Sequence, residues 1–162
     1  TPEAPDAETA LGGRTPRQVM TVTNADIDAV YRAYRYAPGE SNLVVFSAPQ
    51  LSIFEIQHLA DLFGGRRVAP HMQAFITTNH AIFSDAKRLG YVDILESAGV
   101  RFLQGVCFYL LQRFSQIRQE NGWTNLISNS GKLVNTITAH RFNTVLRRTA
   151  QCVEIACSGE LT

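Results

Sequence analysis

The sequence has no long hydrophobic run and no marked excess of either charge. No apolar stretch approaches the roughly 18 residues that a membrane-spanning helix needs, and no signal peptide opens the chain. Fifteen Lys and Arg stand against fourteen Asp and Glu, so the net charge is +1. A nucleic-acid or anionic-membrane surface would need a much more basic balance. We therefore expect a cytoplasmic protein with no nucleic-acid and no membrane partner.

Cysteine is scarce as well. The three cysteines, Cys107, Cys152 and Cys157, are odd in number and show neither zinc nor ferredoxin spacing. We expect reduced thiols, or thiolates on a metal, rather than a disulfide framework. A buried and inert cysteine is the ordinary interpretation of each.

Several well-known catalytic patterns are missing. There is no Ser–His–Asp set, and no pair of carboxylates falls in the loops where a ligand is expected. The segment Asn129-Ser130-Gly131-Lys132 is not a P-loop, because the required upstream glycine is absent. The chain therefore offers no evident general base of its own. It begins with Thr1 rather than Met, so we expect it to be a piece of something longer.

The composition itself is that of one folded domain. The chain has 162 residues, is 45% hydrophobic and contains only 6 Pro and 11 Gly, which is enough apolar material for a core. The charge sums to −2 over residues 1–40, to 0 over 41–104 and to +3 over 105–162. This drift places any anion-binding surface in the C-terminal third.

Short apolar runs alternate with helical stretches from residue 23 onwards. Strands are predicted at 43–46, 74–78, 100–103 and 125–128, with a possible fifth at 144–147. Helices are predicted at 24–36, 53–63, 80–89, 92–97 and 150–157, with Ser52, Asn79 and Thr149 as caps of the second, third and last. The alternation predicts an α/β fold, a three-layer parallel sheet of four or five strands flanked by helices. We expect residues 1–22, with two prolines near their start, to form an extended segment that packs on a partner, and residues 23–162 to form the α/β domain.

Ligands of such folds bind at the carboxyl ends of the strands, which selects four loops for attention. The candidates for substrate binding come from two of them: Ser47, Gln50, Ser52, Asn129, Ser130 and Lys132. The Lys132 charge and the Ser130 hydroxyl suit a carboxylate or phosphate, and free amides at the 47–52 turn favour anions. The plainer interpretations stay open, namely a tight turn capped by Ser52 and a polar turn with a solvated lysine. His80, at a predicted helix start, could also contact an anion.

Five segments, in order, resemble the large subunit or large domain of the aconitase X family of dehydratases. They are Thr1-Pro2-Glu3-Ala4-Pro5 with Gly12-Gly13-Arg14, Ala48-Pro49-Gln50-Leu51-Ser52, Val100 to Cys107, Asn129-Ser130-Gly131-Lys132, and Cys152-Val153 with Gly159. The family's corresponding motifs are Cys-Pro-His-Leu-Ser for the second segment, a run ending in Asp-Thr-Cys for the third and Asn/Ser-Ser-Gly/Ala-Lys for the fourth. The family includes cis-3-hydroxy-L-proline dehydratase and archaeal phosphomevalonate dehydratase. The likeness spans essentially the whole chain.

The resemblance implies an aconitase-like domain of a hydro-lyase, the C-terminal part of the family's large domain. It also implies an iron–sulfur cluster held by three cysteines, at positions that correspond to Ala48, Cys107 and Cys152 here. One of the three is alanine, and Gln50 replaces the family histidine. The family's base lies in the small subunit or domain, so the resemblance implies that this chain acts with the remaining large-domain and small-subunit portions and is neither stable nor active alone.

The sequence leaves three functions open. The first is a hydro-lyase acting on a small hydroxy acid such as a hydroxyproline. The second is a cluster-free descendant that catalyses another non-redox elimination or cyclisation, and the third is a non-catalytic structural subunit. Ala48 favours the second over the first on mechanism. If the fold is the family's, Cys107 and Cys152 should both face the crevice beside Ala48, and no intact cluster should form.

Overall fold

The structure is a computed structural model that describes residues 3–34 and 41–161. Contacts within the chain divide it into two units, Thr1–Val30 and Tyr31–Thr162. The role predicted for residues 1–22 on a partner stays a prediction.

The N-terminal unit holds two short helices started by local side-chain bonds. Helix α1 (Ala7–Leu11) begins where Asp6 accepts a hydrogen bond from the Thr9 amide at 2.7 Å. Helix α2 (Asn24–Ala33) begins at the predicted position, with Thr23 and Asp26 bonded to each other, and the boundary between the units falls inside it. The prediction had extended this helix to residue 36, and residues 35 and 36 lie outside the described residues.

The second unit is built on a parallel sheet of five strands, as predicted. The strands are β1 (Ser41–Phe46), β2 (Gln73–Thr78), β3 (Val100–Gln104), β4 (Asn125–Ser128) and β5 (Asn143–Leu146). Their order in the sheet is β3-β2-β1-β4-β5, and every neighbouring pair is parallel. All five predicted strands are therefore confirmed, with ends that differ by no more than two residues.

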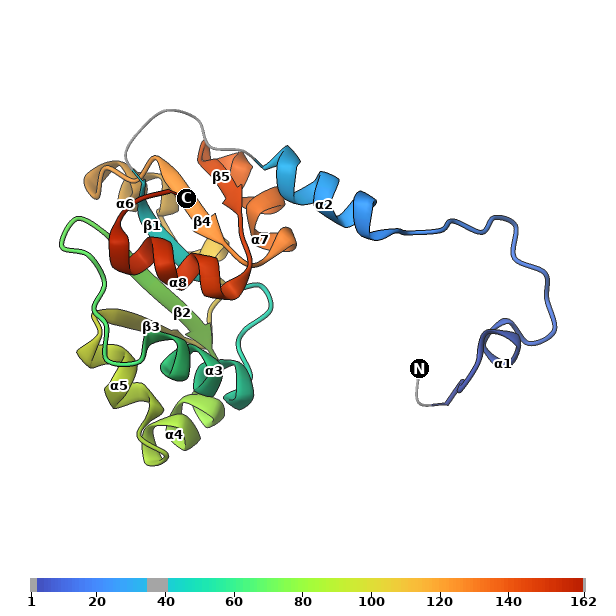
Figure 1. The fold of residues 1–162 in the computed structure, drawn as a ribbon, viewed down its shortest axis with the longest axis horizontal. Coiled ribbons are helices and arrows are strands. Elements are labelled where there is room, and N and C mark those ends of the chain that lie inside the picture. Colours follow the sequence, from blue (N-terminus) through green and yellow to red (C-terminus); the bar gives the residue numbers. More distant parts are fainter. Residues whose placement is uncertain (1–2, 35–40, 162) are drawn as a thin grey trace. The chain divides into compact units, whose positions relative to one another are not determined.

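Alternate residues of each strand enter two different core clusters, one on each face of the sheet. In β1, Val44 and Phe46 belong to one cluster, whereas Leu43 and Val45 belong to the other. This is the period of two that a pleated strand imposes, and it explains why the run Leu43 to Phe46 is apolar throughout. The sheet is thus the middle of three layers, as the α/β prediction requires (Figure 1).

Four helices supply the first cluster, which is mainly aliphatic. They are α3 (Ile53–Phe63), α4 (His80–Arg88), α5 (Tyr91–Ser97) and α8 (Thr149–Ser158). The predicted caps of two are confirmed, because Ser52 and Glu55 form a capping box on α3 and Asn79 accepts from the Ile82 amide on α4. The predicted cap of α8 was wrong. Arg148 occupies the cap position and Thr149 is the first helical residue, so its hydroxyl is available elsewhere.

Shorter elements supply the second cluster, which is rich in aromatic rings. They are the 3-10 turns η1 (Phe108–Leu110) and η2 (Ile137–His140) with helices α6 (Phe114–Glu120) and α7 (Gly131–Thr136). None was predicted, because each is too short to show a helical period. Packing holds them instead. Phe108 and Trp123 contact Phe75 of β2, and Phe114 contacts both of them, with ring centroids 5.2–6.5 Å apart.

No helix among the residues described is long and apolar enough to cross a bilayer.

Candidate functional site

The order of the strands identifies the place along the carboxyl edge of the sheet where a crevice forms. The chain runs outwards from β1 to β2 and β3, then returns to place β4 on the other side of β1. The connections after β1 and β4 therefore diverge to opposite faces, which leaves a crevice at the carboxyl ends of these two strands. The predicted candidates Ser47 to Ser52 and Asn129 to Lys132 follow these two strands.

The loop after β1 is bonded to the fold beneath it. Ser47 is 2% exposed, and its hydroxyl lies 2.6 Å from the Thr77 hydroxyl at the end of β2. The Thr78 hydroxyl donates to the Leu51 carbonyl at 2.7 Å. Ser47 therefore lies below the surface in this structure, and its predicted contact with a substrate stays a prediction.

Ser52 is occupied in the capping box of α3. Its hydroxyl and its amide both donate to the Glu55 carboxylate, at 2.7 and 2.8 Å. The plain alternative for Ser52 given by the sequence, a cap at a tight turn, is confirmed.

Ser130 ties the two loops together. Its hydroxyl donates to the Ala48 carbonyl at 2.6 Å and accepts from the Leu133 amide at 3.1 Å, which caps α7. Below it, the buried Ser128 hydroxyl donates to the Val45 carbonyl at 2.6 Å and accepts from the Ser130 amide at 3.1 Å. Ala48 turns the chain sharply here with φ of 56°. These hydroxyls hold the two strand ends in place.

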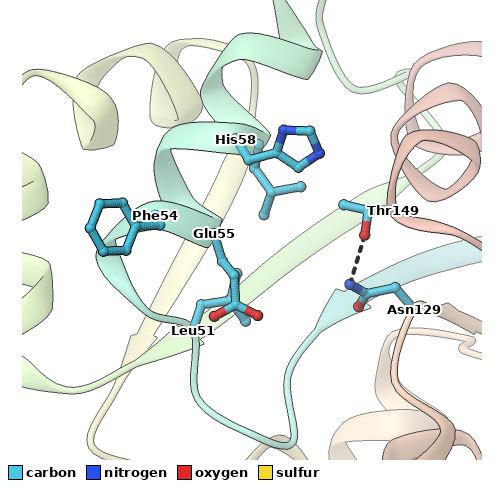
Figure 2. Close-up of a pocket in the computed structure, with 7 residues that line it drawn as sticks. Leu51, Phe54, Glu55, His58, Asn129 and Thr149 are labelled. Atoms are coloured by element: carbon cyan, nitrogen blue, oxygen red, sulfur yellow. Dashed lines mark hydrogen bonds between the residues drawn. The ribbon is translucent and has the colours of Figure 1, made fainter.

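A pocket of about 190 Å³ lies beside these loops, between α3 and the start of α8 (Figure 2). Its lining combines apolar side chains with one carboxylate, one imidazole, one amide and one hydroxyl. The lining residues are Leu51, Phe54, Glu55, His58, Leu59, Asn129 and Thr149. A volume of this size holds roughly six waters, or a compact organic molecule.

The polar groups of the pocket come from both walls. On one side the Asn129 amide donates to the Thr149 hydroxyl at 3.1 Å, and on the other α3 presents Glu55 and His58 (Figure 2). Donors and acceptors on facing walls above an apolar floor suit a small ligand that carries hydroxyl or carboxyl groups. Asn129 was predicted as a site residue, and the structure brings it into this pocket.

Three polar residues of this lining, Glu55, His58 and Thr149, were not predicted as site residues from the sequence. Glu55 and His58 are three residues apart on a correctly predicted helix, so the sequence places them on one face. It does not say which face meets the sheet edge. Thr149 was assigned to a cap, and that error hid its bond to Asn129.

Lys132 and Gln50 remain from the predicted set. Lys132 is the second residue of α7, is exposed, and forms no hydrogen bond or ion pair within the described ranges. Gln50 is half-buried, and its amide donates to the Val106 carbonyl at 3.1 Å, which joins the loop after β1 to the loop after β3. Lys132 is thus the predicted site residue whose charge stays available for an anion.

The family model that matches the chain is the aconitase X third domain, over residues 41–158. That range contains the whole sheet and both loops of the crevice. The chain belongs to the aconitase X family.

Curated relatives agree with this assignment. Cis-3-hydroxy-L-proline dehydratase of Pseudomonas aeruginosa is 31% identical over 98% of this chain and 27% of its own length. The phosphomevalonate dehydratase large subunit of Thermococcus kodakarensis is 26% identical over 80% of this chain and 32% of its own length. The chain thus spans about a quarter to a third of these aconitase X relatives.

A solved structure agrees on the fold. The crystal structure of Thermococcus kodakaraensis aconitase X in its holo-form superposes with a TM-score of 0.72 and 22% identity, over 85% of this chain and 34% of that one.

Membership in the aconitase X family raises the question of whether these residues can hold the iron–sulfur cluster that the resemblance implies. Each protein-held iron needs a thiolate. Ala48 offers a methyl group, which packs in the aromatic cluster on one face of the sheet. Cys152 is fully buried in the aliphatic cluster on the other face, where its thiol lies 3.6 Å from the Arg147 carbonyl.

Cys152 and Cys107 also differ in their surroundings. Burial raises the pKa of the Cys152 thiol to about 12, so it stays protonated at neutral pH. Cys107 is half-buried in the loop after β3. Within the described residues, no three His, Cys, Asp or Glu side chains are grouped so that they could hold a metal ion. These residues do not fit a three-thiolate cluster.

Proposed function

We propose that this chain is the third-domain portion of an aconitase X-like hydro-lyase that removes water from a small hydroxy acid such as a hydroxyproline. The observation that carries the proposal is the third-domain match over residues 41–158, which contains every strand of the sheet. The pocket at the divergence of β1 and β4 supports it, because its size and facing polar groups suit a molecule of that class.

The role of this chain in that reaction is to bind and orient the substrate. Lys132, the second residue of α7, supplies a positive charge for the substrate carboxylate. Asn129 and Thr149 orient a hydroxyl group from the pocket wall. The apolar residues Leu51 and Leu59 exclude water from the bound molecule.

The base that removes the substrate proton comes from a partner chain or domain. Two observations support such a partner. Phe54, Val106 and Leu110, which follow the ends of β1 and β3, are exposed by 77%, 38% and 70%. In the segment 1–22, Val19, Met20 and Val22 are exposed by 77%, 78% and 72%. The remaining large-domain and small-subunit portions would cover these apolar side chains in a cytoplasmic heteromeric enzyme, where the three unpaired thiols would stay reduced.

The test is to purify the protein with its partner portions and incubate it with cis-3-hydroxy-L-proline, following the loss of water by mass spectrometry. Lys132→Gln should raise KM about 10- to 100-fold, because a charge-assisted bond is worth about 1.5–3 kcal/mol. Lys87→Gln, the matched control on the exposed last turn of α4, should leave KM unchanged. An intact complex that eliminates water from no hydroxy acid would favour the non-catalytic subunit instead.

A second candidate is favoured by Ala48, namely a cluster-free descendant that catalyses another non-redox elimination or cyclisation. The missing thiolate at Ala48 and the burial of Cys152 in the aliphatic cluster support it. The protein purified without oxygen should then lack stoichiometric iron and sulfide, and Cys107→Ser should barely change activity. Stoichiometric iron and sulfide in the unmodified protein would contradict this candidate.

A further inference from the structure

A second constellation lies on the other half of the sheet edge, where β2 and β3 end together. Thr78 pairs with Gln104, and the Gly105 amide donates to the Thr78 carbonyl at 2.8 Å, which extends the pairing by one residue. The next residue after Thr78 is Asn79, the cap of α4, so His80 is the first residue of that helix. His80, Gln104 and Gly105 are thereby brought to one point by backbone structure.

The imidazole of His80 is held from two sides. Its Nδ1 lies 3.0 Å from the Gln104 amide oxygen. Its ring also lies against Gly105, where a Cβ atom would be only 2.9 Å from Nε2 and 3.4 Å from Cδ2. Gly105 has φ of 70°, a conformation that glycine adopts without strain. Residue 105 must be glycine for the ring to keep this position.

This arrangement selects the protonation pattern of the ring. An amide oxygen can only accept, so Nδ1 carries a proton in the bond to Gln104. Nε2 is then the nitrogen that exchanges a proton with another molecule, and the His80 side chain is exposed at this edge. Nε2 lies beside Gly105, which has no side chain, and a ring oriented by a hydrogen bond at Nδ1 is the usual form of a histidine acid or base.

The constellation adjoins the loops already described. Val106 follows Gly105, and its carbonyl accepts from Gln50 of the loop after β1. His80 therefore stands on the carboxyl edge of the same sheet as the crevice, where small ligands of open α/β folds bind.

We propose that His80 is the general acid of this site and that Gln104 is its positioning residue, an inference that rests on the proposed elimination of water. The imidazolium donates its Nε2 proton to the departing hydroxyl group. The C–O bond breaks with its electron pair on oxygen, water leaves, and neutral imidazole remains. The base of the partner takes the C–H proton, and that electron pair forms the C=C bond. Gln104 accepts from Nδ1 before and after the transfer, and the imidazole recovers its proton from solvent.

The test uses the protein with its partner portions and two matched histidine variants. His80→Gln should lower kcat about 100-fold or more with KM within threefold, because a general acid acts on the reacting bond rather than on substrate binding. His71→Gln, a control at an exposed position in the loop before β2, should keep kcat within twofold.

Gly105→Ala tests the position of the ring while leaving His80 in place. The added methyl displaces the ring, so this variant should lose about as much kcat as His80→Gln, and the double variant should lose no more than either. Turnover in His80→Gln within threefold of the parent would overturn the proposal and leave the proposed function standing.

Nitrogen-15 NMR of the ring gives a readout that needs no turnover. The parent should show a proton on Nδ1 of neutral His80, and Gln104→Ala should lose that preference. If the complex turns over no hydroxy acid, the proposed function fails. The proposal for His80 is then tested by titrating the protein with cis-3-hydroxy-L-proline and following the Nε2 resonance. An Nε2 resonance that the ligand does not shift would overturn the proposal.

Discussion

The two halves of the carboxyl edge share buried hydroxyls that bond to the protein, and they differ in the polar side chains that remain exposed. At the ends of β1 and β4, the hydroxyls of Ser47, Ser128 and Ser130 bond to the protein at 2.6 Å, and two of the three are fully or almost fully buried. At the end of β2, the buried Thr77 and Thr78 hydroxyls bond to the protein in the same way. Beside them, His80 is exposed and Gln104 is half-buried, and the hydrogen bond between these two orients the imidazole. Polar residues on one edge of one sheet therefore divide into those that stabilise loops and those available to a ligand.

The comparison also shows where the side chains that could bind a ligand lie. Near β1 and β4, the residues that remain available are Lys132 and the pocket residues Asn129 and Thr149. The serines hold the backbone that carries them. The difference can be measured, because a structural hydroxyl affects stability and an available side chain does not.

The largest effect on stability is expected for Ser128→Ala. The Val45 carbonyl and the Ser130 amide would both lose their partner in a fully buried place, so the free energy of unfolding should fall by about 2–3 kcal/mol. Ser84→Ala on the exposed face of α4 is the control, with a change of less than about 0.5 kcal/mol. Urea denaturation of the purified protein measures both. If the two variants unfold at the same urea concentration, the Ser128 hydroxyl does not stabilise the fold.

Gly105→Ala should follow, with a loss of about 2 kcal/mol. Part of this loss is the cost of a left-handed conformation for alanine, about 1–2 kcal/mol, and the rest is displacement of the His80 ring. Gly122→Ala isolates the first part, because Gly122 has a similar φ of 62° and open space around it. If the two variants unfold at the same urea concentration, the contact with His80 contributes nothing.

The buried thiol should make stability depend on pH. The pKa of Cys152 is raised from 9.0 to about 12 in the folded protein, so the folded state keeps a proton that the unfolded state loses. The free energy of unfolding should therefore fall as pH rises above 9, by about 1.4 kcal/mol for each unit up to pH 12. Cys152→Val should remove this part of the slope between pH 9 and 10. If Cys152→Val keeps the full slope of unfolding free energy against pH, the buried thiol is not its cause.

Lys132→Gln should have the smallest effect on folding. Lys132 is exposed and bonds to none of the residues described, so the free energy of unfolding should change by less than about 0.5 kcal/mol. Lys87→Gln should behave alike, and only their effects on KM should differ. A loss above 1 kcal/mol for Lys132→Gln would assign it to the structural group with the serines.

The strands and the longer helices were predictable because their signals are local. Leu43 to Phe46 is apolar throughout and has strand length, and the bonds between Ser52 and Glu55 join residues three apart. Helix α7 shows the limit of such signals. It has six residues and begins at Gly131, a residue that favours a turn, and its burial of Leu133 and Val134 against the sheet holds it helical.

The position of the candidate site was predictable from the sequence, but the role of each residue in it was not. Strand ends select the loops, and side-chain chemistry makes Asn129 and Lys132 the candidates there, a prediction that their position in the structure leaves standing. Whether Ser130 faces a substrate or another loop depends on Ala48, 82 residues away in the chain. No local pattern carries that information.

The sequence by itself thus determined the α/β class, the five strands, the caps of α3 and α4 and the residues that resemble the aconitase X motifs. Each of these depends on residues that are neighbours in the chain, or on their order along it. Tertiary structure alone decided that β4 lies beside β1, that Thr149 meets Asn129, and that the His80 ring takes the space over Gly105. These contacts join residues 20 or more positions apart, and only the packing of complete elements on the sheet brings such residues together.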